Sequence, residues 1–145
     1  MVDGFFRSPF VGFKWFIQFV NNPFFFRLIR NTFLIGLYSF IWGYPAPIIL
    51  ALLINEIRSK YFKRLTQTIT YMPHFISTVI VVGILYTIFG YNGLINQLLT
   101  TLGLEPMQFV GSSKWFRTLY IGSGIWRGVG WGTIIYLASL SGIDP

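Results

Sequence analysis

The chain has 145 residues, of which 54% are hydrophobic, 20% are aromatic and only 10% are charged. A soluble domain of this length carries about 25% charged residues, so the composition predicts a membrane protein. With no cysteine, one histidine and four acidic residues, disulfides and cysteine-based metal sites are excluded, and little material remains for an enzyme. The net charge of +7 comes from basic residues at the ends of apolar runs, which favours anchoring at a membrane surface over binding to nucleic acid.

Residues 1–31 combine many aromatic side chains with four basic ones, and no stretch among them is long enough to cross a bilayer. We therefore expect an interfacial segment that lies against the lipid headgroups. Asn22 followed by Pro23 predicts the start of a helix, with the asparagine as its cap and the proline as its first residue.

The next run, residues 31–55, carries no charge and exceeds the roughly 20 apolar residues that a helix needs to cross the hydrocarbon core. We place the first spanning helix at about residues 32–55. Pro45 and Pro47 lie in the middle of this span and predict a kink, because proline lacks the backbone N–H of a helical hydrogen bond. In a membrane, neighbouring helices can satisfy the carbonyl groups that such a kink exposes.

A second uncharged run covers residues 65–104 and is too long for one straight helix. The turn signal GYNGL at 90–94 divides it into a second span at about residues 66–89 and a short amphipathic segment that is expected at the interface. A third span is expected at about residues 118–141. All three are predicted to be helices, because an isolated strand leaves its backbone polar groups unsatisfied in lipid.

The orientation of these spans stays open on composition alone. Four basic residues lie close together in the segment EIRSKYFKR between the first and second spans, and this density favours the cytoplasmic side. A count of basic residues favours the opposite side, because the N-terminal segment and the second loop together carry six.

Arg127 is the main candidate for a functional residue, because a charge in the middle of a spanning helix costs a few kcal/mol. At helical spacing it shares one face with Tyr120, Ser123 and Trp131, and this face is a candidate lining for a solute pathway. In the alternative interpretation, the Arg127 side chain extends outward to the headgroups or caps carbonyl groups of a neighbouring helix, with no contact to a solute.

Gly124, Gly128 and Gly132 form a ridge of small residues on the adjacent face, which is suited to close packing between helices. His74 has no second histidine or carboxylate nearby in the sequence, so it is a poor metal ligand and is expected at a helix start or interface. The glycine-rich segment GSGIWRG lacks the spacing of a phosphate-binding loop. We therefore expect no metal, no cofactor, no catalytic residue and no ATP site in this chain.

Several phrases of the sequence, taken in order, resemble one family of transport proteins. The phrases are SPFVGFKWF, NPFFFRLIRNTFLIGLYS, YPAPIILALLINEIRSKYFKRLTQTITYMPHF, SKWFR and IWRGVGWGTIIYLASLSGIDP. They are similar to the permease subunits of bacterial binding-protein-dependent ABC importers, in the sugar and polysaccharide branch. The resemblance covers residues 8–145. It implies an all-α membrane protein in which residues 32–145 form part of a permease transmembrane domain.

The resemblance also implies a function and partners. The chain would form part of the pathway for uptake of a sugar or oligosaccharide across the bacterial plasma membrane, by alternating access powered by separate ATPase subunits. Its partners would be a second permease subunit, two cytoplasmic ATPase subunits and an extracytoplasmic solute-binding protein, besides the lipid bilayer. The permease itself carries out no covalent chemistry.

Members of this family begin with a further transmembrane helix, which would place residues 1–31 outside the cytoplasm and EIRSKYFKR inside. In the family, the residues that correspond to Asp144 and Pro145 lead into a cytoplasmic loop that docks the ATPase, and two more helices follow. The resemblance therefore implies that this chain is a fragment of a permease, which by itself does not couple transport to ATP hydrolysis.

A rival interpretation is a small stand-alone membrane protein that acts in interaction or assembly and has no transport activity. Its three spans and interfacial segment would then be complete. A reading frame that continues past Pro145 into the docking loop favours the permease. A membrane-embedded enzyme is the weakest interpretation, because the spans offer only one histidine and one arginine.

Overall fold

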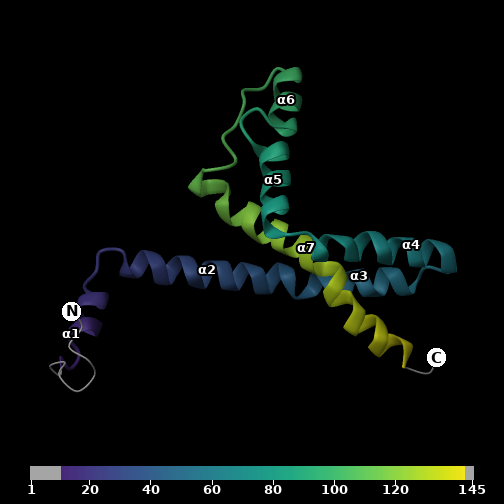
Figure 1. The fold of residues 1–145 in the computed structure, drawn as a ribbon, viewed down its shortest axis with the longest axis horizontal. Coiled ribbons are helices and arrows are strands. Elements are labelled where there is room, and N and C mark those ends of the chain that lie inside the picture. Colours follow the sequence, from purple (N-terminus) through teal and green to yellow (C-terminus); the bar gives the residue numbers. More distant parts are fainter. Residues whose placement is uncertain (1–10, 143–145) are drawn as a thin grey trace. The chain divides into compact units, whose positions relative to one another are not determined.

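The computed structural model describes residues 11–142, and every regular element that it assigns in this range is a helix. The predicted all-helical class is therefore confirmed for the described residues (Figure 1). The elements in chain order are α1 (Lys14–Val20), α2 (Phe25–Gly43), α3 (Pro45–Asn55), α4 (Lys60–Tyr71), the 3-10 turn η1 (Met72–Phe75), α5 (Thr78–Phe89), α6 (Leu94–Thr101) and α7 (Ser113–Ser141).

The contacts within the chain define two units, Met1–Gly36 and Leu37–Pro145. The described part of the first unit holds α1, whose side chains are all exposed, and the beginning of α2. All the other helices belong to the second unit. The expected division into an interfacial segment, 1–31, and a transmembrane part, 32–145, stays a prediction.

Helix α2 begins close to the predicted start. The Asn22 side-chain oxygen accepts a hydrogen bond from the backbone N–H of Phe24 at 2.9 Å, as a capping residue does. The first helical residue is Phe25, however, and not the expected Pro23. The helix that leads into the first predicted span therefore begins several residues earlier than residue 32.

The first predicted span is helical throughout, and two helix assignments meet where the prolines stand. Helix α2 ends at Gly43, α3 begins at Pro45, and Tyr44 joins the two. Pro45 thus occupies the first position of a helix, where its missing N–H leaves no hydrogen bond unmade. Tyr44 itself has helical φ and ψ angles of −70° and −48°, and its N–H donates to the Phe40 carbonyl oxygen at 3.1 Å, so residues 25–55 form one helical stretch.

The second predicted span, 66–89, is not one continuous helix. Helix α4 ends at Tyr71, the turn η1 follows, and α5 begins only at Thr78. Pro73 explains the break, because its ring lacks an N–H and clashes with the carbonyl group one turn earlier. Ser77 then starts the new helix, since its side-chain oxygen accepts a hydrogen bond from the Ile80 N–H at 3.4 Å.

Two helical stretches in the described part of the chain are long and apolar enough to cross a membrane, Phe25–Asn55 and Thr78–Thr101. The third predicted span, 118–141, lies within α7, a single helix of 29 residues. Its length is sufficient, but α7 is not among the two apolar stretches. Three spanning helices are therefore not confirmed. The described residues contain two helical stretches that are long and apolar enough to be candidates for membrane spans.

Helix α7 organises the second unit by packing against α3, α4 and η1 (Figure 1). At Gly130 the approach is so close that a Cβ atom would overlap the carbonyl group of Thr70 in α4. Thr133, one turn later, is fully buried. Its hydroxyl donates to the carbonyl oxygens of Val129 at 2.7 Å and of Pro47 in α3 at 3.3 Å. These two residues thus join α7 to both neighbouring helices.

A buried asparagine holds the α5–α6 arm together. Asn96 is 2% exposed, and its side-chain nitrogen donates to the carbonyl oxygens of Gly90, Tyr91 and Met107 at 3.2, 3.0 and 2.8 Å. Its side-chain oxygen accepts from the Met107 N–H at 2.8 Å. One side chain therefore ties the turn between α5 and α6 to the loop that returns towards α7.

Few apolar side chains are buried within the described residues. The buried ones are Ala51, Ile54, Val81, Phe109 and Ile121. Large apolar side chains are exposed on every helix from α1 to α7. Soluble monomers rarely expose contiguous apolar surface on this scale, so these helices require cover by lipid or by other protein.

Candidate functional site

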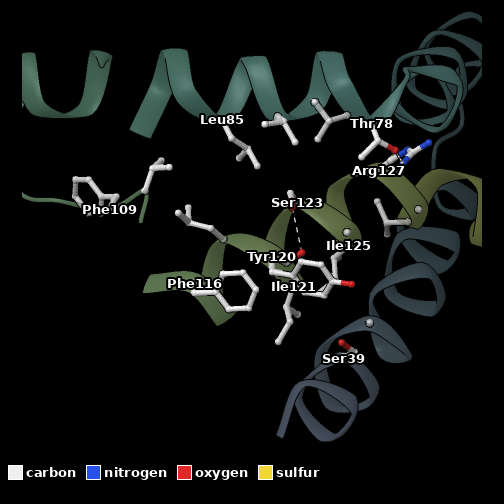
Figure 2. A pocket seen from close by; sticks show the side chains of 18 of the residues that line it. Ser39, Thr78, Leu85, Phe109, Phe116, Tyr120, Ile121, Ser123, Ile125 and Arg127 are labelled. Carbon is white, nitrogen blue, oxygen red and sulfur yellow. Dashed lines mark hydrogen bonds between the residues drawn. The ribbon is translucent and has the colours of Figure 1, made fainter. Parts of the chain in front are cut away.

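A cavity of about 860 Å³ lies between α5 and α7 in the second unit. Its lining runs along α5 from Thr78 to Tyr86 and along α7 from Phe116 to Gly132. The α2–α3 junction and the loop residues 109–111 complete the lining. Figure 2 shows the cavity with Phe109 at one end and Arg127 at the other.

Arg127 lies in the wall of this cavity and is half-buried. Its guanidinium Nη1 donates a hydrogen bond of 2.9 Å to the hydroxyl oxygen of Thr78 (Figure 2). Thr78 is the first residue of α5, so the contact joins the middle of α7 to the start of α5. None of the described residues that line the cavity is acidic. The arginine is therefore held by a neutral partner at the edge of an open space.

Two more residues of the predicted pathway face line the same cavity. The Tyr120 ring stacks on Phe116, with the ring centroids 5.8 Å apart and the planes at 17°, and both rings border the cavity. The Ser123 hydroxyl donates to the Tyr120 carbonyl oxygen at 3.1 Å. The cavity therefore combines aromatic surface with a few polar groups, a pattern that is typical of small-molecule sites.

Trp131, the fourth residue of the predicted face, does not line the cavity. Its ring stacks on the imidazole of His74, with centroids 4.6 Å apart and planes at 5°, and the Phe75 ring meets it edge-on at 5.7 Å. His74 thus packs at the interface between η1 and α7, as expected for a histidine without metal-ligand neighbours.

The three glycines of the predicted ridge also border the cavity, but only Gly132 has a close neighbour, the Pro47 Cβ atom at 3.2 Å from a Cβ built on that glycine. A Cβ atom at Gly124 or Gly128 would meet no atom within 4 Å. Within this chain, the two glycines leave room in the cavity, and the closest packing of α7 falls at Gly130.

Sequence reasoning missed Thr78 as the partner of Arg127, because the two residues lie 49 positions apart. It also missed Gly130, because this glycine is not in register with the other three. The sequence does contain one signal for the position of Thr78. Ser77 before an apolar run is a capping signal for a new helix, and such a helix places Thr78 at its start.

A second cavity of about 540 Å³ lies between the same two helices, lined by apolar and aromatic side chains that include Trp115 and Trp126. Its lining residues carry no charge. Among the described residues, no group of three or more potential metal ligands occurs. Asp144 and Pro145, which were predicted to approach the ATPase-docking loop, lie outside the described residues.

Enlarging Gly128 should fill the first cavity without disturbing the fold. The family resemblance implies a transporter, and for it we expect solute uptake to fall progressively from Gly128→Ala to Gly128→Leu to Gly128→Trp, with at least about a tenfold loss for tryptophan, because the larger side chains occupy the space that the glycine leaves open. Gly36→Trp is the matched control, since a Cβ atom at Gly36 also meets nothing within 4 Å and Gly36 does not line the cavity. Equal uptake by both tryptophan variants would contradict a solute pathway here.

Comparison with known proteins identifies the relatives of this chain. No family model matches it. Its sequence is 44% identical over 142 residues to Protein LplB of Bacillus subtilis (strain 168) and 44% identical over 143 residues to the polygalacturonan/rhamnogalacturonan transport system permease protein YteP of the same organism. The alignments cover 97% and 98% of this chain, but 45% and 44% of the two relatives. The chain thus spans less than half the length of these relatives.

Two solved structures of bacterial alginate ABC transporters match the fold, each with 41% sequence identity. Their TM-scores are 0.88 and 0.90, over 93% and 97% of this chain and 47% and 49% of the matched chains. Over nearly its whole length, the chain is therefore a homologue of ABC transporter permeases. Its relatives are more narrowly sugar and polysaccharide permeases, which confirms the family resemblance found in the sequence.

Proposed function

We propose that this chain forms part of the permease subunit of an ABC importer that takes up a sugar or oligosaccharide across the bacterial plasma membrane. The similarity to two curated proteins at 44% identity over almost the whole chain carries this proposal. The chain supplies part of the solute pathway and alternates access between the two sides of the membrane. ATP hydrolysis belongs to separate cytoplasmic subunits.

The break in the chain before α5 supports a pathway at the α5–α7 cavity. The chain crosses the membrane three times in this proposal, at about residues 32–55, 66–89 and 118–141. The second of these segments is interrupted at residues 72–77, where the turn η1 separates α4 from α5. Non-helical backbone at membrane depth is tolerated only where protein buries it or where it lines a cavity. This interruption ends beside Thr78, which lines the cavity.

The proposed partners are a second permease subunit, two ATPase subunits and an extracytoplasmic solute-binding protein. One of the matched structures is described as an alginate ABC transporter in complex with an alginate pentasaccharide-bound periplasmic protein, which supports the last of these. The exposed apolar side chains of α2, α5 and α7 supply surface for both lipid and a second permease.

A saccharide is the solute class that the cavity and the relatives favour together. Aromatic rings such as those of Phe116 and Tyr120 offer flat apolar surface to the faces of sugar rings. Among the relatives, one is named for polygalacturonan and rhamnogalacturonan at 44% identity, whereas those named for lactose and arabinooligosaccharides are 28% and 27% identical.

Disruption of the reading frame in the natural host tests this proposal. We expect the disrupted strain to lose uptake of at least one labelled oligosaccharide from a panel of acidic and neutral compounds, and the intact gene to restore it. A strain with synonymous codon changes at the same positions is the control. Unchanged uptake of every compound, with the protein present in the membranes of the parent strain, would leave the rival assembly role as the better explanation.

A further inference from the structure

We propose that the Arg127–Thr78 end of the cavity binds a carboxylate of the solute, so that the transporter selects acidic saccharides over their neutral counterparts. This inference rests on the proposed function and specifies its substrate class. It requires three things: a positive site to which the described residues offer no negative partner, donors that remain available to the solute, and space beside them for sugar rings.

The charge of Arg127 is not balanced within the described cavity. Its hydrogen-bond partner is the neutral hydroxyl of Thr78, and no described lining residue is aspartate or glutamate. The two acidic residues in the described range, Glu56 and Glu105, both lie outside the lining. A charge that is half-buried in apolar surroundings without a counter-ion is costly, and a bound anion removes that cost.

The start of α5 adds a second positive element at the same place. Thr78 is the first residue of this 12-residue helix, and a helix N-terminus carries a partial positive charge with backbone N–H groups that lack helical partners. Arg127 lies directly against it, at 2.9 Å from the Thr78 hydroxyl. Two positive groups side by side repel each other, whereas an anion between them is attracted by both. Broken membrane helices of other transporters present such N-termini to anionic solutes.

The chemistry of the guanidinium selects a carboxylate on a sugar. Arginine has five N–H donors in a planar fork that matches the two oxygens of a carboxylate, and the contact with Thr78 uses one nitrogen, Nη1. The other donors remain to bind the solute. Towards the opposite end of the cavity stand the rings of Phe109, Phe116 and Tyr120 (Figure 2), which offer apolar surface to the uncharged faces of the sugar.

Paired saccharides that differ only in charge test the inference. The natural host is given digalacturonate or the galactobiose of the same linkage, in which hydroxymethyl groups replace the carboxylates, and initial uptake of each is measured above the level of the gene-disrupted strain. The ratio of acidic to neutral uptake is the readout, because it cancels differences in the amount of folded transporter. We expect the wild type to favour digalacturonate.

Arg127→Gln should lower this ratio by about ten- to a hundredfold, the range expected for the loss of a charge-assisted hydrogen bond. Arg127→Lys keeps the charge but not the fork, so we expect a smaller fall in the ratio. This variant also decides the question if Arg127→Gln does not accumulate in the membrane. Lys114→Gln, which removes an exposed cation from the first turn of the same helix, should leave the ratio unchanged.

Three outcomes overturn the inference. Equal uptake of the two saccharides by the wild type, or an unchanged ratio in the Arg127 variants, refutes charge selection while leaving the importer function intact. An equal fall in the ratio with Lys114→Gln would assign the effect to general surface charge. If the wild type takes up no saccharide above the disrupted strain, the proposed function itself fails, and this fourth result is distinguishable from the other three.

Discussion

Replacement of Gly130 by alanine is expected to destabilise the second unit by about 3 kcal/mol or more, at the upper end of the range for overpacked sites. The added Cβ atom would overlap the carbonyl group of Thr70 and approach the Tyr71 backbone nitrogen to 2.9 Å. Backbone atoms cannot move aside as a flexible side chain does, so α7 and α4 must separate. The buried hydroxyl of Thr133, which joins α7 to α3, would then lose its position as well.

The measurement is an SDS titration of the protein in mild detergent micelles, followed by tryptophan fluorescence. Gly124→Ala is the matched control on the same helix, because a Cβ atom there meets nothing within 4 Å. This variant should change stability by no more than about 1 kcal/mol, and in the stabilising direction, since alanine favours the helix over glycine. Equal stability of the two variants would show that the α4–α7 contact is not as close as the structure has it.

Removal of the Asn96 side chain is the second change with a large expected effect. Asn96→Ala leaves three backbone carbonyl groups and the Met107 N–H without their partner, and we expect a loss of about 2–4 kcal/mol from these buried groups. Asn96→Asp should be at least as harmful, although it has nearly the same shape. A carboxylate can still accept from Met107 N–H, but it cannot donate to the carbonyl oxygens and it repels them.

Limited proteolysis of the loop between α6 and α7 reports this loss locally, and the SDS titration reports it globally. Gln97→Ala serves as the control, because Gln97 is the next residue of α6 and its hydrogen bond to the Asn92 carbonyl oxygen is exposed. We expect its effect to stay below about 1 kcal/mol. A loop that is cleaved equally in the Asn96 and Gln97 variants would refute the role of Asn96 in holding the arm.

The candidate site was only partly accessible to sequence reasoning. Helical spacing predicts that Tyr120, Ser123, Arg127 and Trp131 share one face of a helix, and three of them do line the cavity. Trp131 instead packs on His74, which comes from another element. Spacing along one helix determines which residues share a face, but it does not determine which part of that face a neighbouring element covers.

The glycines of α7 illustrate the same limit. Their spacing predicts a ridge, and small residues allow both close packing and open space. The choice between the two depends on the path of α4 and α3, because Gly130 meets Thr70 while Gly128 faces an opening. The end of α4 depends in turn on the break at Pro73, which a count of apolar residues does not reveal.

The sequence by itself determined the helical class, the apolar character and the resemblance to a family of transporter permeases. These follow from composition, from the length of uncharged runs and from phrases that extend along almost the whole chain, all of which are local or additive properties. Only the tertiary structure decided that the second predicted span is broken, that Asn96 and Thr133 are buried hydrogen-bonding groups, and that Arg127 meets Thr78. Each of these depends on the relative position of residues far apart in the sequence, and hence on how the helices pack.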